Sequence, residues 1–196
     1  MRELTYFVAG SLDGRIAAPD GSTDAFPLDP GYLAALAEDW GDAFPTAFHA
    51  AVGTEPPLTR FDTVLMGRET FAPALAAGVA DPYAHLETYV YSSTLDPAAH
   101  PAVHVVSGDP VAHVRGLKAT EGGGLWLCGG GRLAATLADE IDHLVVKLNP
   151  VTLGQGRPLL DGPLEPRRWR LASSRTHDDV GVVLLAYERA VSAAGW

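Results

Sequence analysis

The chain has 196 residues, and 47% of them are hydrophobic, which is enough for one domain with a sizeable core. The formal net charge of −10 and the scattered Lys and Arg residues argue against nucleic acid as a partner. No stretch approaches the ~20 apolar residues of a membrane span and no signal peptide is recognisable, so a cytoplasmic protein without a membrane partner is expected. The single cysteine, Cys128, excludes an internal disulfide and a multi-cysteine zinc site.

In chain order, the first predicted element is a buried strand at residues 4–10. Residues 11–17 follow this strand, and a loop rich in Pro, Gly and Asp comes after them. Asp29 and Pro30 start a helix, because Asp caps free N–H groups and Pro fits the first turn. Apolar residues keep a helical spacing as far as Trp40. A short helix is predicted at residues 45–52.

The middle of the chain alternates strands with helices. A strand at residues 61–66 precedes a helix that runs from Gly67 to about Ala77. Two short strands, at residues 88–91 and 103–106, lead to an amphipathic helix between Asp109 and Thr120. A strand at residues 125–128 then ends in three glycines, and a helix is predicted over residues 132–139.

The last third of the chain is dominated by strands. A strand is predicted at residues 141–148, a loop rich in Gly and Pro at 150–163, and an antiparallel hairpin from residues 169–174 and 182–187. Strands that alternate with helices and end in a hairpin predict an α/β sheet covered on both faces, mainly parallel before the hairpin. We expect a single domain over residues 1–196, because no repeat or low-complexity linker divides the chain.

The three consecutive glycines at residues 129–131 have two interpretations. A tight connection between a strand and a helix can require glycine by itself. The other interpretation is an anion site, in which backbone N–H groups approach a phosphate at the positive end of a helix.

Other predicted strands also end in glycines and hydrogen-bond donors. The residues concerned are Gly67, Arg68 and Thr70, then Ser92 and Ser93, then Ser107, then Gly129, Gly130, Gly131 and Arg132. Ligands of parallel α/β sheets bind outside the carboxyl ends of the strands. Two helix N-termini, each with an arginine, form a credible pyrophosphate cradle, and an arginine near Ser93 favours NADP(H) over NAD(H).

Five segments in order resemble the dihydrofolate reductase-like superfamily: residues 9–17 (AGSLDGRIA), 64–71 (VLMGRETF), 91–93 (YSS), 128–133 (CGGGRL) and 142–148 (DHLVVKL). More narrowly, they are similar to the C-terminal reductase domain of riboflavin biosynthesis and its stand-alone bacterial relatives. The resemblance covers nearly the whole chain, with residues 41–59 matched least. It implies a three-layer α/β/α fold around a mixed, mostly parallel sheet with a C-terminal antiparallel hairpin.

The resemblance also implies an NADPH site. Gly67, Arg68 and Thr70 would meet the phosphates and the adenosine side of the cofactor, and Ser92 and Ser93 would bracket the adenine ribose and its 2′-phosphate. The pyrophosphate would be wrapped by Gly129, Gly130, Gly131, Arg132 and Leu133. Ala9 and Ile16 would border the nicotinamide.

The expected reaction is hydride transfer from NADPH to a small heterocyclic substrate, most like that of 5-amino-6-(5-phosphoribosylamino)uracil reductase. Asp13 and Asp24 are the candidate catalytic residues, although Asp13 also fits a turn in which its carboxylate bonds nearby backbone. A phosphorylated substrate needs cations, and Arg15, Lys147 and Arg157 are the obvious ones near the nicotinamide. No metal site is expected, because the histidines form no HExxH pair.

Two alternatives stay open. One is a dihydrofolate or pterin reductase of the same fold, although Asp29, the acidic residue at the start of the first helix, is better explained as a cap. The other is a non-catalytic NADP(H)-binding module. The resemblance also suggests a homodimer through the terminal strands, for which the apolar run at residues 182–187 is suited; packing within one sheet explains that run equally well.

Overall fold

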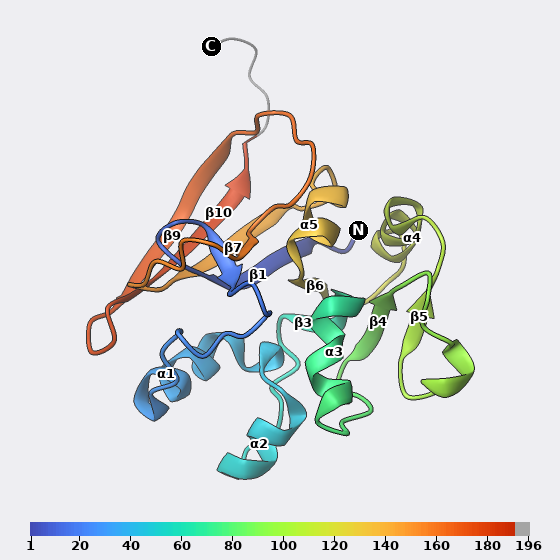
Figure 1. Ribbon diagram of the computed structural model, residues 1–196, viewed down its shortest axis with the longest axis horizontal. Helices are drawn as coiled ribbons and strands as arrows, with labels where there is room; N and C mark the ends of the chain where they lie inside the picture. Colours follow the sequence, from blue (N-terminus) through green and yellow to red (C-terminus); the bar gives the residue numbers. More distant parts are fainter. Residues whose placement is uncertain (191–196) are drawn as a thin grey trace.

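A computed structural model describes residues 1–190, which form a mixed eight-stranded sheet with the strand order β5-β4-β3-β6-β1-β7-β10-β9 (Figure 1). Most strands of this sheet run parallel to one another: β1 (Leu4–Gly10), β3 (Phe61–Gly67), β4 (Glu87–Tyr91), β5 (His104–Val106), β6 (Gly124–Gly129) and β7 (His143–Leu148). The C-terminal hairpin of β9 (Trp169–His177) and β10 (Val182–Arg189) is antiparallel, with β10 paired to β7. The expected sheet and hairpin are confirmed.

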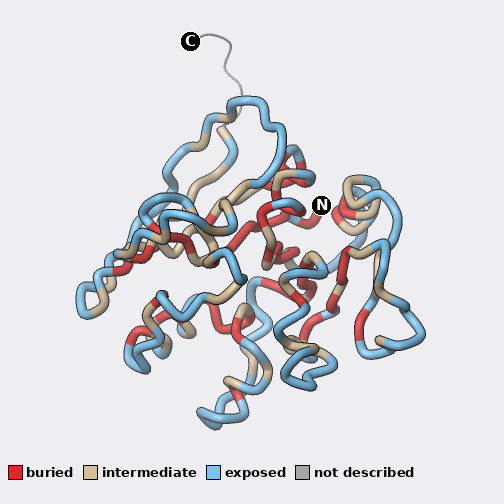
Figure 2. Tube along the Cα trace, viewed as in Figure 1, coloured by how far each residue is buried: buried red, intermediate tan, exposed pale blue. Residues whose placement is uncertain are grey.

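Helices cover both faces of the sheet, which gives the expected three layers. On one face, α1 (Pro30–Trp40), α2 (Thr46–Val52) and α3 (Arg68–Ala76) pack around a core that includes Phe7, Trp40 and Trp126. On the other face, α4 (Pro110–Lys118) and α5 (Gly131–Thr136) pack against Tyr6, Leu65 and the residues around them. Figure 2 shows the buried residues concentrated in the central strands and the exposed ones in the outer loops.

Local capping explains where the helices begin. The Asp29 carboxylate accepts a hydrogen bond of 3.0 Å from the Tyr32 N–H, and Pro30 occupies the first turn of α1. Asp109 caps α4 in the same way by accepting from the Val111 N–H at 2.9 Å. Asp29 therefore acts as the cap that the sequence predicts.

Two predicted boundaries near the glycine turn are wrong by a few residues. The helix expected over residues 132–139 ends at Thr136, because tight turns follow it, including a hydrogen bond of 2.8 Å from Glu140 N to Leu137 O. The strand expected from residue 141 begins at His143. Asp142 just before it uses its carboxylate to accept from the Leu4 N–H at 2.8 Å, in place of a regular pairing between backbone groups.

The loop predicted at residues 150–163 contains an unexpected strand. Its β8 (Arg157–Pro158) pairs antiparallel with β2 (Arg15–Ala17), and the sequence predicts neither segment as a strand. Hydrogen bonds from Leu159 N to Gly14 O and from Asp161 N to Gly131 O tie this loop to both neighbouring turns. The loop therefore lies across the carboxyl ends of the central strands. No helix within residues 1–190 is long and apolar enough to cross a membrane.

Candidate nucleotide-binding and active site

The glycine turn joins β6 to α5, and its three glycines have different surroundings. Gly129 adopts φ of +136°, which side-chain-bearing residues rarely adopt. A Cβ on Gly131 would lie 2.2 Å from the Pro158 carbonyl oxygen, so the packing of the β8 loop requires glycine there. A Cβ on Gly130 would meet only the Thr70 hydroxyl oxygen, at 3.3 Å. The backbone conformation of Gly129 and the packing of Gly131 thus explain glycine at these two positions, and a ligand contact at Gly130 stays a prediction.

The turn after β3 lies directly beside the glycine turn. A Cβ on Gly67 would be 3.9 Å from both Gly129 O and Gly130 N and 4.0 Å from the Leu133 Cβ atom. Thr70, in the first turn of α3, faces Gly130 from the other side. The structure therefore brings together residues that the sequence assigns to the cofactor phosphates.

Two exposed arginines flank these turns. Arg68 is 53% exposed and donates to the Glu69 carboxylate at 2.7 Å, while Arg132 is 87% exposed and lies 3.3 Å from the Asp161 carboxylate. Exposed ion pairs of this kind contribute little to stability, so a phosphate can compete for either guanidinium. Arg157 also lies 3.7 Å from Glu69.

The serines at the next strand ends differ in how their hydroxyls are used. The Ser92 hydroxyl accepts from the backbone N–H groups of Thr94 and Leu95 at 3.1 and 3.0 Å, so it stabilises its own turn. Ser93 and Ser107 are exposed, and their hydroxyls have no hydrogen bond to any other part of residues 1–190. Their hydroxyls are the ones available to a ligand.

The carboxylate of Asp13 accepts hydrogen bonds from three groups of the protein. It accepts from the Ser11 hydroxyl at 2.5 Å and from the N–H groups of Leu153 and Gly154 at 3.0 and 2.7 Å. The hydrogen bonds from Ser11 and Leu153 lower the pKa of Asp13 to about 2. The backbone partners of Asp13 lie in a distant loop and not in its own turn, and a catalytic role for Asp13 stays a prediction.

Asp24 and the residues expected at the nicotinamide are placed as follows. Asp24 is exposed in the loop before α1, and its carboxylate makes no hydrogen bond within residues 1–190. Ala9 is half-buried near the carboxyl end of β1, and Ile16 lies in β2 against the core of the α4–α5 face. Their contact with a cofactor stays a prediction, as does a role for Asp24.

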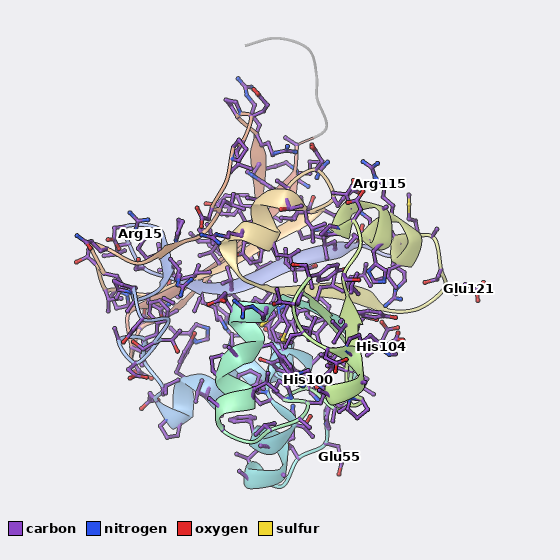
Figure 3. The ribbon with its side chains drawn as sticks, turned by 45° about the vertical axis from the view of Figure 1, so that its right-hand side comes forward. Arg15, Glu55, His100, His104, Arg115 and Glu121 are labelled. Atoms are coloured by element: carbon purple, nitrogen blue, oxygen red, sulfur yellow. The ribbon has the colours of Figure 1, made fainter. Side chains whose placement is uncertain are left out.

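Of the expected cations, Lys147 contacts a ring of the core. Its Nζ atom lies 4.3 Å from the centre of the Phe7 ring, and burial lowers its pKa to about 8. The sequence signal for the position of Lys147 is its spacing from Val145, because residues two apart in a strand share a face of the sheet. Arg15 lies in β2. Figure 3 shows Arg15 on the opposite side of the view from His104, Arg115 and Glu121.

Two surface depressions lie away from Asp13 and Asp24. One, of about 540 Å³, is lined by Arg132, Asp139, Asp161 and Arg167 among others, and the second, of about 320 Å³, is more apolar and includes Tyr6 and Trp169. The two share Leu164, Glu165 and Arg167. Arg132 is the one residue of the expected site that either of them includes.

Parallel strands, a C-terminal hairpin and glycine turns at adjoining strand ends together define a reductase-like α/β domain. The chain belongs to the RibD C-terminal domain family, whose model matches residues 2–184. The expected family and fold are therefore confirmed.

Relatives of similar length support this assignment. The chain is 29% identical to the uncharacterized protein YwjB of Bacillus subtilis, covering 96% of this chain and 99% of that protein. It is 25% identical to a putative riboflavin biosynthesis protein from Shewanella sp. PV-4, with a TM-score of 0.69 and coverage of 97% and 100% of the two chains.

A bifunctional diaminohydroxyphosphoribosylaminopyrimidine deaminase/5-amino-6-(5-phosphoribosylamino)uracil reductase from Thermotoga maritima shares the fold. It is 14% identical, with a TM-score of 0.65, and the match covers 96% of this chain and 57% of that one.

Proposed function

We propose that the protein is an NADPH-dependent reductase that transfers a hydride to a small heterocyclic substrate, most like 5-amino-6-(5-phosphoribosylamino)uracil. The observation that carries the proposal is the juxtaposition of Gly67 and Thr70 with the Gly129–Gly130 turn in a chain of this family. Two adjacent glycine turns with flanking arginines suit a pyrophosphate.

The roles of the residues follow from their positions. Gly130 N–H and the Thr70 hydroxyl would hold the pyrophosphate, Arg132 would neutralise its charge, and Arg68 with Ser93 would hold the 2′-phosphate. NADPH supplies the hydride chemistry when bound. Ala9, at the carboxyl end of β1, would position the nicotinamide beside the central strands.

The experiment measures NADPH oxidation by its absorbance, with 5-amino-6-(5-phosphoribosylamino)uracil and dihydrofolate supplied in separate reactions. Turnover with the first compound supports the proposal, and turnover with dihydrofolate alone would replace it with the folate alternative. Tight NADPH binding without oxidation of NADPH by either compound would instead favour a binding module that lacks turnover.

Arg68→Ala is expected to weaken NADPH binding about tenfold or more and NADH binding less than about twofold, because only NADPH carries the 2′-phosphate. A fluorescence titration of both cofactors measures the two dissociation constants. Arg132→Ala is the matched control, since the pyrophosphate that it would contact is common to both cofactors. Equal losses for the two cofactors in Arg68→Ala would show that Arg68 does not recognise the 2′-phosphate.

The homodimer stays a proposal. In the structure β10 lies between β7 and β9, so the apolar run at residues 182–187 is used within the sheet. The outer strand β9 has Leu171 48% exposed, which leaves room for a second copy at that edge.

A further inference from the structure

Lys147 occupies an unusual position for a lysine. It lies near the carboxyl end of β7, paired in register with Ala9 of β1 on one side and Leu184 of β10 on the other. Its Nζ atom lies 4.3 Å from the centre of the Phe7 ring. Phe7 in turn stacks on Trp40 of α1 with a centroid distance of 4.4 Å. Lys147 is thus the strand neighbour of Ala9, the β1 residue assigned to the nicotinamide.

The ammonium group has no acidic partner. Among residues 1–190, Lys147 Nζ makes neither a hydrogen bond nor an ion pair, and it lies over the face of the Phe7 ring. The chain has one other lysine, Lys118, whose Nζ lies 2.6 Å from the Asp142 carboxylate and 2.9 Å from Glu140 O. Lys147 is half-buried, and a charge in such surroundings is normally paired, so the unpaired amine of Lys147 needs another explanation.

The titratable group that interacts electrostatically with Lys147 is neutral at pH 7. Cys128 on β6 is the group that interacts electrostatically with Lys147, and burial raises the pKa of its thiol to about 11. Burial also raises the pKa of Tyr83 well above its ordinary value and that of Tyr32 on α1 to about 12. Among the α1 carboxylates, Glu38 is exposed, and Asp39 lies 3.0 Å from Arg175. From the hairpin, His177 packs edge-on against Tyr32.

We propose that Lys147 is the proton donor of the reduction. The inference rests on the proposed function and adds the group that completes it. The hydride forms a bond to the C=N or C=O carbon of the substrate, and the π-bond electrons move to the nitrogen or oxygen. That atom takes a proton from the Lys147 ammonium, which becomes a neutral amine and regains its proton from water.

The environment of Lys147 suits a proton donor better than the environment of Asp13 does. Burial lowers its pKa to about 8, which makes it a stronger acid than a free lysine while leaving it mostly protonated at pH 7. The neutral amine formed after transfer is the form that the apolar surroundings favour. Asp13, with a pKa of about 2, is ionised at neutral pH and has no proton to give.

The test compares Lys147→Met and Lys147→Arg with the unsubstituted protein, using NADPH and 5-amino-6-(5-phosphoribosylamino)uracil across a range of pH. The unsubstituted protein should lose kcat as the pH rises through about 8. Both variants should lower kcat roughly 100-fold and lack this alkaline decline, because arginine keeps the charge but does not release its proton. The NADPH dissociation constant should change less than about twofold. His143→Gln, at the other end of β7, is the control and should keep the decline.

Three outcomes would overturn the assignment. If Lys147→Arg keeps kcat while Lys147→Met raises KM, the residue holds an anionic group of the substrate and gives no proton. If Lys147→Met keeps both kcat and the alkaline decline, another group is the donor and the reductase function stands. If the unsubstituted protein itself oxidises no NADPH, the proposed function fails, and the role of Lys147 fails with it.

Discussion

Replacing Gly130 by valine is expected to weaken NADPH binding about 100-fold or more while the protein stays folded. A Cβ at this position meets only the Thr70 hydroxyl, which needs to move by a few tenths of an ångström. The rest of the side chain would occupy the space assigned to the pyrophosphate. A fluorescence titration with NADPH, together with circular dichroism, measures both parts of the expectation.

Gly131→Ala is the matched control one residue away, with the opposite expected result. Its Cβ would lie 2.2 Å from Pro158 O and 3.3 Å from Leu159 O, and both are backbone atoms that cannot rotate away. We expect a loss of about 1–3 kcal/mol or more in the free energy of unfolding. Unchanged NADPH affinity in Gly130→Val would refute the pyrophosphate site, and unchanged stability in Gly131→Ala would contradict the packing of the β8 loop.

Replacing Lys147 by methionine is expected to raise the free energy of unfolding at pH 7 by up to about 3 kcal/mol. Methionine fills a similar volume without a charge, and the lysine ammonium is unpaired beside Phe7. Denaturant unfolding of the two proteins at pH 7 and at pH 10 measures the difference. A stabilised protein with lower turnover is the pattern expected when a buried charge is retained for function.

The pH dependence of this difference has a definite sign. Burial lowers the pKa of Lys147 from 10.5 to about 8 in the folded protein, so between these values the unfolded chain binds more protons. The penalty of the buried charge is therefore complete below pH 8 and disappears as the pH rises towards 10.5. The advantage of Lys147→Met should shrink over that interval, and a constant difference would mean that the folded pKa is not lowered.

Lys118→Met provides the contrast, because this amine is paired. Its removal leaves Glu140 O without this donor and leaves the Asp142 carboxylate with the Leu4 N–H as its remaining donor, and we expect a loss of about 2 kcal/mol at pH 7. Opposite signs for the two lysines would show that pairing decides whether each charge stabilises the fold. A loss of stability in both variants would contradict that explanation.

Much of the fold could be predicted because its signals are local. Asp29 and Asp109 mark helix starts through hydrogen bonds that span two or three residues, and the short apolar runs mark the parallel strands. The order of the glycine and serine turns along the chain also indicated a nucleotide site, since parallel strands present their carboxyl ends at one edge.

The β2–β8 pair was missed because its two strands, Arg15–Ala17 and Arg157–Pro158, are short and lie about 140 residues apart in the sequence. The start of β7 depends on a side chain, Asp142, that bonds the backbone of a distant strand, and the end of α5 depends on the turn closed between Glu140 N and Leu137 O. Such pairings leave no periodic pattern in the sequence.

The sequence by itself determined the α/β alternation, the C-terminal hairpin and the set of turns from which a cofactor site could be built, because capping, glycine content and apolar spacing act over a few residues. Only the tertiary structure decided what each residue of those turns does. It assigned Gly131 to the close approach of Pro158, Ser92 to its own turn and Asp13 to a contact with the loop at residues 153–154, and it left Gly130 open. It also placed the unpaired amine of Lys147 over Phe7, because burial and pairing of a charge depend on strands far apart in the chain.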